Sequence, residues 1–130
     1  MVTHGTFYWN ELMTRDTGRA RAFYGKSLGW TFAEMPMEEG SVYVVANLGD
    51  RPVGGMFQMD GPQFEGVPEH WMSYIAVDNV DERLELAVAH GGEVLRPPYD
   101  VAGIGRIAIL KDVGGAVQGW MTPSEVTDQT

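Results

Sequence analysis

The sequence predicts an α+β fold made of two βαβββ modules. Three observations support this prediction. Each half of the 130-residue chain begins with a strand-like segment that leads into a capped helical segment. Each helical segment ends at glycine, and three further strand-like segments follow it. The two halves can also be aligned at a nearly constant offset, which indicates an internal duplication.

The first half starts with residues 6–14, TFYWNELMT, whose aromatic and β-branched side chains favour a strand. Asp16 or Thr17 can cap the helix that follows, in which apolar residues recur at helical spacing up to Leu28. Gly29 suits the left-handed conformation that ends many helices. Turn residues then separate three predicted strands, at residues 31–38, 41–48 and 52–59.

The second half follows a joint rich in glycine and proline, residues 60–70. Residues 71–77 predict a strand, and Asp78 or Asn79 can cap the second helix before the Gly91-Gly92 stop. One face of this helix is predicted to carry Val80, Leu84, Ala87 and Val88. The last three strands are expected near residues 93–101, 105–112 and 116–123.

These boundaries predict a single domain over residues 1–123, with module one at about 5–60 and module two at about 69–123. Residues 124–130 are predicted to form a polar tail. An offset of 63 residues pairs Trp9 with Met72, Asp16 with Asn79, and Gly29 with Gly92. An offset of 64 residues then pairs Tyr43 with Ile107 and VGGMF with VQGWM.

Composition excludes several function classes. The chain has 9 basic and 18 acidic residues and a net charge of −9, which argues against nucleic acid or an anionic membrane as a partner. It has no cysteine, so disulfides, thiolate chemistry and Cys-ligated zinc are excluded. We expect a cytoplasmic protein, because the sequence shows neither a secretory leader pattern nor an apolar stretch of membrane-spanning length.

The paired modules, with AFYGKSLGW after the first strand and KDVGGAVQGW before the last, resemble the vicinal oxygen chelate superfamily. This superfamily contains glyoxalases, bleomycin-resistance proteins and extradiol dioxygenases. The resemblance covers about residues 5–123 and implies a cup-shaped half-barrel in pseudo-twofold repeat, with the helices outside. It also makes a homodimer plausible. It does not fix a reaction, because one fold supports many activities.

Enzymes of this superfamily hold a divalent metal with His or Glu on the first and last strand of each module. The matching positions in this sequence are Trp9, Gly55, Met72 and Gly119. None of these side chains is a ligand for a hard divalent metal. We therefore expect no metal and no other cofactor, with a divalent metal at a different set of residues as the alternative.

Strand alternation predicts instead a cup wall of aromatic residues, methionine and glycine. Gly55 and Gly119 are expected to leave gaps beside the larger side chains, so the wall suits a flat or apolar small molecule. The alternative is a collapsed core without a ligand. The predicted substrate-binding residues are Phe7, Trp9, Glu11, Gly55, Phe57, His70, Met72, Tyr74, Gly119 and Met121.

Glu11 is the candidate catalytic residue. Apolar surroundings would raise the pKa of its carboxyl toward the range useful for acid–base catalysis. Alternatively, Glu11 is a surface carboxylate paired with Arg15 or Arg19. Tyr74 could donate a hydrogen bond to a bound carbonyl group, or it is an ordinary core tyrosine.

Two function classes remain open at this point. The first is a glyoxalase- or bleomycin-resistance-like protein that binds a small molecule without metal. The second is a glyoxalase-like lyase or dioxygenase-type enzyme that uses a divalent metal or Glu11 acid–base chemistry.

Overall fold

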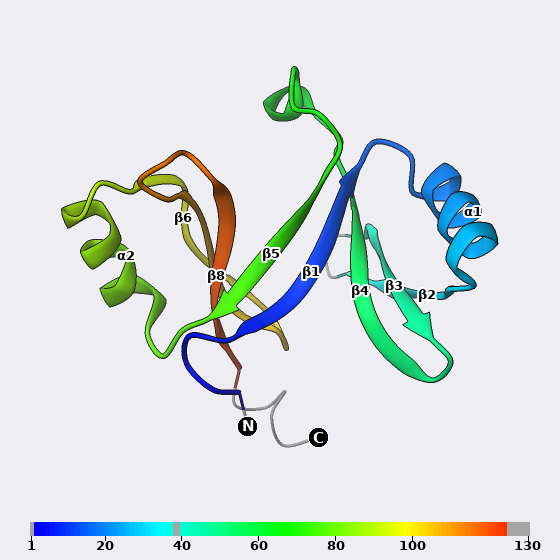
Figure 1. Cartoon of the computed structure of the whole chain (residues 1–130), viewed down its shortest axis with the longest axis horizontal. Coiled ribbons are helices and arrows are strands. Elements are labelled where there is room, and N and C mark those ends of the chain that lie inside the picture. The colour runs from blue at the N-terminus through cyan, green and yellow to red at the C-terminus, as the bar shows by residue number, and fades with distance from the viewer. Residues whose placement is uncertain (1, 38–39, 125–130) are drawn as a thin grey trace. The chain divides into compact units, whose positions relative to one another are not determined.

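The computed structural model describes residues 2–37 and 40–124. They contain the eight strands and two helices that the sequence predicts, in the order of two βαβββ modules (Figure 1). The chain divides into two compact units. One runs from Trp9 to Met72, and the other combines the residues up to Tyr8 with those from Ser73 onward. The division falls inside the first strand of each module.

The Trp9–Met72 unit contains the helix and three closing strands of the first module. Its strands lie in the order β2-β3-β4-β1. β1 runs parallel to β4, with Glu11 opposite Gly55, and the pairs β2–β3 and β3–β4 are antiparallel. The elements are β1 (Phe7–Thr14), α1 (Thr17–Leu28), β2 (Thr31–Pro36), β3 (Val42–Leu48) and β4 (Arg51–Gln58), followed by the short 3-10 helix η1 (Pro62–Phe64).

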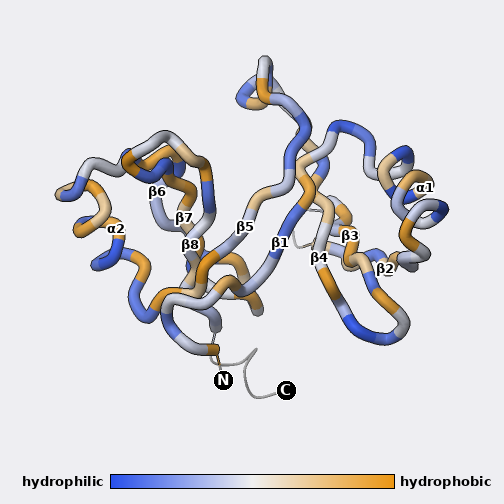
Figure 2. The backbone as a smooth tube through the Cα atoms, in the orientation of Figure 1, coloured by the Kyte–Doolittle hydropathy of each residue, from blue (hydrophilic) through white to orange (hydrophobic). Residues whose placement is uncertain are grey.

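Helix α1 has the ends that the sequence predicts. The Asp16 side chain accepts a hydrogen bond from the Arg19 N–H at 3.0 Å, and Gly29 closes the helix with φ of 80°. Ala20 and Tyr24 pack against a core of Leu12, Val44 and Met56. No residue of α1 is fully buried, and Figure 2 shows hydrophilic residues interrupting the apolar ones along it. The contact between α1 and the sheet is therefore loose.

The other unit holds the second helix and its closing strands, with the order β5-β8-β7-β6. β5 runs parallel to β8, as β1 does to β4. The elements are β5 (His70–Ala76), α2 (Val80–Ala89), β6 (Glu93–Val101), β7 (Gly105–Lys111) and β8 (Val117–Pro123).

Helix α2 packs closely on its own strands. Asn79 caps it by accepting a hydrogen bond from the Glu82 N–H at 3.1 Å. Val80 and Leu84 are buried in a core with Val77, Ala108 and Leu110. The prediction was wrong for Val88, which is 53% exposed. At 3.6 residues per turn, Val88 is rotated away from the stripe that Val80, Leu84 and Ala87 form.

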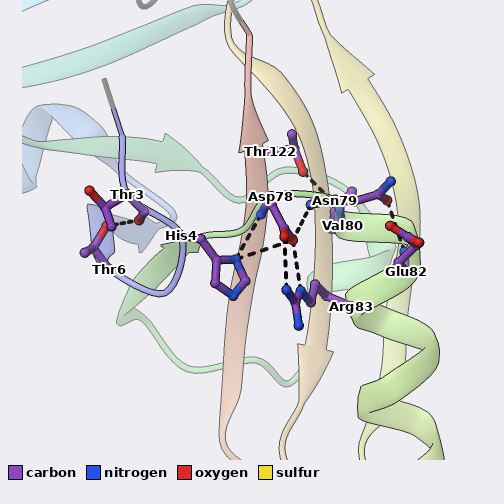
Figure 3. Close-up of polar contacts among 9 residues, drawn as sticks. All are labelled: Thr3, His4, Thr6, Asp78, Asn79, Val80, Glu82, Arg83 and Thr122. Carbon is purple, nitrogen blue, oxygen red and sulfur yellow. Dashed lines mark hydrogen bonds and ion pairs between the residues drawn. The ribbon is translucent and has the colours of Figure 1, made fainter.

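Asp78 is part of an ion-pair cluster where α2 begins (Figure 3). Arg83 donates to both Asp78 carboxylate oxygens, at 2.9 and 3.0 Å, while the Asp78 N–H donates to His4 Nδ1 at 3.0 Å. The Arg83 hydrogen bonds, and then the Asn79 N–H, lower the pKa of Asp78 to about 2. These contacts tie the N-terminal segment to the start of α2.

The two modules confirm the predicted element order and the repeat of strand, capped helix and three strands. Most of the predicted polar tail, residues 125–130, lies outside the described residues. Neither described helix is long and apolar enough to cross a membrane.

Candidate functional site

One face of the sheet in the Trp9–Met72 unit carries Trp9 and Glu11. Side chains alternate along β1, so these two residues lie on one face while Leu12 lies against α1 on the other. Glu11 is only 8% exposed, and Trp9 is half-buried. A carboxylate with so little exposure must be hydrogen-bonded, because an unpaired buried charge is costly.

Tyr43 on β3 provides one hydrogen bond to Glu11. The Tyr43 hydroxyl donates to Glu11 Oε1 at 2.8 Å and accepts from Trp9 Nε1 at 2.9 Å. Since β4 lies between β3 and β1, the Tyr43 side chain must cross β4 to reach Glu11. It crosses at Gly55, where an added Cβ would lie 1.8 Å from the Tyr43 hydroxyl oxygen. Gly55 therefore allows Trp9, Tyr43 and Glu11 to form one hydrogen-bonded chain.

This chain has a fixed direction of donation. Burial, and then the neighbouring Glu11 carboxylate, raise the pKa of Tyr43. The Tyr43 phenol therefore stays protonated, and its O–H donates a hydrogen bond to Glu11. A carboxylate has about four acceptor positions, so Glu11 can accept from further donors besides Tyr43. The arrangement suits recognition of a group that donates a hydrogen bond or carries positive charge.

The structure corrects the expectation that Gly55 and Gly119 leave open gaps. The Tyr43 side chain covers Gly55, and the Tyr74 ring covers Gly119, where an added Cβ would lie 2.4 Å from the ring. The prediction was wrong because it treated each strand separately, whereas a long tyrosine side chain on one strand can cover a glycine on its neighbour.

The remaining predicted residues are divided between the two units. Phe57, 38% exposed, has its ring 6.1 Å from that of Phe64, and the Met72 side chain is buried. In the other unit Phe7 is 73% exposed, whereas Tyr74 and Met121 are buried. The predicted ligand wall thus contains both exposed and core side chains. The structure brings together Trp9, Glu11 and Gly55, to which Tyr43 must be added.

His70 lies elsewhere in the Trp9–Met72 unit. It lines a cavity on the α1 side of the sheet, together with Leu12, Tyr24 and Trp71. Its ring Nδ1 lies 2.8 Å from the Pro68 carbonyl oxygen. Arg15 and Arg19, the expected surface partners of Glu11, contact Glu69 instead.

Sequence reasoning missed Tyr43 as a member of the site. One signal could have indicated it: Val45 lies opposite Gly55 in the β3–β4 pair, and Tyr43 is the next residue on the same face of β3. A large residue at that distance from a glycine on the neighbouring strand is placed to extend across it.

The residues at the implied metal positions do not fit a divalent metal. Trp9 already donates its only polar hydrogen to Tyr43, Gly55 and Gly119 have no side chain, and Met72 offers a soft thioether. Among residues 2–37 and 40–124, no group of three or more His, Asp or Glu could hold a metal ion.

The chain is similar in sequence to one family model and to several named proteins. Residues 6–47 match the family model described as bleomycin resistance protein-like N-terminal. The chain is 40% identical over 120 residues to the "Putative glyoxylase CFP32" of Mycobacterium bovis, covering 92% of this chain and 45% of that protein. It is 29% identical over 135 residues to the "Anthracycline biosynthesis protein DnrV" of Streptomyces peucetius, covering 92% of this chain and 49% of that protein. The chain thus spans about half the length of these relatives.

Solved structures share the fold at low sequence identity. A hypothetical protein of Bacillus halodurans matches with a TM-score of 0.69 and 16% identity, over 95% of this chain and 97% of that chain. Methylmalonyl-CoA epimerase of Mycobacterium tuberculosis matches with a TM-score of 0.64 and 12% identity, over 100% of this chain and 97% of that chain.

Proposed function

Because the chain belongs to the vicinal oxygen chelate superfamily, we propose that it binds a small molecule with a flat ring system at Trp9, Tyr43 and Glu11. Binding would not require a metal. The observation that carries the proposal is the hydrogen-bonded chain through which Tyr43 and Trp9 hold a buried carboxylate in one orientation. A preorganised acceptor of this kind costs little ordering entropy when a ligand binds.

The ligand is proposed to donate a hydrogen bond or to carry positive charge. The Glu11 carboxylate is an acceptor, and the net charge of −9 favours cations over anions at the surface. The half-buried Trp9 indole offers a surface for stacking a flat ring. The relative named for anthracycline biosynthesis makes an anthracycline a suitable first probe, since such molecules combine flat rings with hydroxyl groups and an amino sugar.

The experiment is a titration with daunorubicin, followed by the fluorescence of the drug and of tryptophan. Glu11→Gln should weaken binding about 10- to 100-fold, because hydrogen bonds to charged groups contribute about 1.5–3 kcal/mol. Glu85→Gln on exposed α2 makes the same change in net charge and should bind like the wild type. Equal affinity of the two variants would refute the assignment of Glu11.

Acid–base catalysis by Glu11 is the second candidate. It is favoured by the position of Glu11, a carboxylate that is only 8% exposed and accepts a hydrogen bond from the Tyr43 hydroxyl. The relative named as a glyoxylase suggests a test substrate, the adduct of methylglyoxal with a thiol. Turnover that is lost in Glu11→Gln and insensitive to chelator would support catalysis, and no turnover by the wild type would exclude this reaction.

Three further predictions remain proposals. They are the cup formed by both modules, the homodimer and the cytoplasmic location. Light scattering of the purified protein would test the homodimer directly, by giving either one or two times the chain mass of 14.3 kDa.

A further inference from the structure

Helix α1 leaves a cavity of about 360 Å³ against its own sheet. A volume of this size is within the range of small-molecule sites. The cavity lies on the face of β1 that carries Leu12, opposite to Glu11, and so differs from the proposed ligand site. The residues that matter for its chemistry are Arg19, Ala20, Tyr24, Glu69, His70 and Trp71.

Its apolar wall is aromatic. The rings of Tyr24 and Trp71 meet edge to face at 5.6 Å, and Trp30 stacks on Tyr24 at 5.4 Å. Trp71 is 40% exposed, so part of its ring surface is open to a ligand. Trp71 Nε1 donates to the Tyr24 hydroxyl oxygen at 3.1 Å, and no described group accepts the Tyr24 O–H proton. The wall therefore offers a stacking surface with one hydrogen-bond donor.

His70 lines the cavity and is the candidate hydrogen-bond acceptor in it. Its Nδ1 lies 2.8 Å from the Pro68 carbonyl oxygen, which can only accept, so Nδ1 carries the proton. In the tautomer that donates from Nδ1 to Pro68, Nε2 is the acceptor of the ring. Among the described residues, no group donates to this Nε2.

The charges at the cavity rim compensate each other. Arg19 lies 3.1 Å from Glu69, whose carboxylate also accepts from the Thr14 hydroxyl and the Arg15 N–H. The Arg15 N–H bond, and then the Thr14 bond, lower the pKa of Glu69, so the carboxylate stays ionised beside Arg19. A neutral ligand is suited to this rim better than an anion or a cation.

We propose that this cavity is a second binding site, for a small neutral phenol. The phenol ring would pack against Trp71 and Tyr24, and its hydroxyl would donate to His70 Nε2. The hydroxyl oxygen could in turn accept from Tyr24 or from Arg19, which has four N–H donors besides the one bonded to Glu69.

The test is ¹⁹F NMR of 4-fluorophenol, with 4-fluoroanisole as the matched ligand that lacks a hydroxyl donor. The wild type should bind 4-fluorophenol about three- to tenfold more tightly than 4-fluoroanisole, as expected for one hydrogen bond. His70→Phe should remove this preference. Ala20→Leu should abolish binding of both ligands by filling the cavity.

His90→Phe is the control. The His90 Nδ1 also lies 2.8 Å from a backbone carbonyl oxygen, that of Leu86, but His90 lies at the end of α2 in the other unit. This variant should bind like the wild type. The proposal is overturned if His70→Phe keeps the preference for the phenol or if Ala20→Leu binds normally.

Discussion

The first and second modules share their element order but differ in how the helix meets the sheet. In the first, no residue of α1 is fully buried, and a cavity remains beside Tyr24 and Trp71. In the second, Val80 and Leu84 of α2 are buried in a continuous core. The comparison shows that helix caps and strand order can repeat while the packing between helix and sheet does not.

The other face of each sheet differs in a similar way. Both modules have a glycine covered by a tyrosine, Gly55 by Tyr43 and Gly119 by Tyr74. In the first module that tyrosine links a tryptophan to a buried carboxylate. The position of the second module that pairs with Tyr43 in the repeat is Ile107, which has no polar group. We infer that the polar recognition proposed for Trp9, Tyr43 and Glu11 belongs to the first module.

The largest difference between the modules is expected in the free energy of unfolding, when one leucine in each helix is replaced by alanine. Leu84→Ala in α2 should lower the free energy of unfolding by about 2–5 kcal/mol, because it leaves a cavity in a packed core. Leu28→Ala in α1 should change it by less than about 0.5 kcal/mol, because Leu28 is 55% exposed. Urea denaturation measures both. Similar losses would show that α1 packs as closely as α2.

The next-largest effect on stability is expected at Gly55, the glycine beneath the Tyr43 side chain. Gly55→Ala should cost about 1–3 kcal/mol, since the new methyl group must displace the Tyr43 side chain. In a Tyr43→Ala background the same change should cost much less, because the clashing atoms are gone. A double-mutant cycle measures this coupling. Additive losses would indicate that Tyr43 does not lie over Gly55.

The two helix caps should be equivalent despite the different packing. Asp16→Ala and Asn79→Ala each remove one side-chain bond to a helix N–H and should each cost about 0.5–2 kcal/mol. Thermal unfolding of the two variants would check this. If only one variant loses stability, the two caps do not stabilise their helices equally, although they occupy equivalent positions in the repeat.

Acid should weaken the ion-pair cluster at α2. The pKa of Asp78 is about 2 in the folded protein, against an ordinary value of 3.8. The unfolded chain therefore takes up this proton first, and the stability from ionised Asp78 is lost as the pH falls from about 4 to 2. Melting temperatures of the wild type should fall more steeply over this range than those of Asp78→Asn. Parallel curves would argue against the Arg83–Asp78 pair.

The sequence predicted the order of elements because turns, caps and strand patterns are local signals. Asp16, Asn79 and Gly29 lie where their residue types predict. Glu11 was identified from strand alternation alone. The role of Tyr43 was not predictable in this way, because its side chain crosses a neighbouring strand whose pairing register the sequence does not state. The cavity beside α1 was missed for a related reason, since Trp71 contacts Tyr24, 47 residues away in the chain.

The most direct measurement of the central inference compares two single-atom deletions. Tyr43→Phe and Tyr24→Phe each remove one hydroxyl oxygen and keep the ring. The Tyr43 hydroxyl links Trp9 to Glu11, whereas the Tyr24 hydroxyl accepts from Trp71 Nε1 on the α1 side of the same unit. Titration with daunorubicin should show binding about three- to tenfold weaker for Tyr43→Phe, which leaves Glu11 and Trp9 without their shared partner. Tyr24→Phe should bind within about twofold of the wild type, a change below that of one hydrogen bond. The opposite order, with the loss in Tyr24→Phe, would contradict the assignment of polar recognition to Trp9, Tyr43 and Glu11.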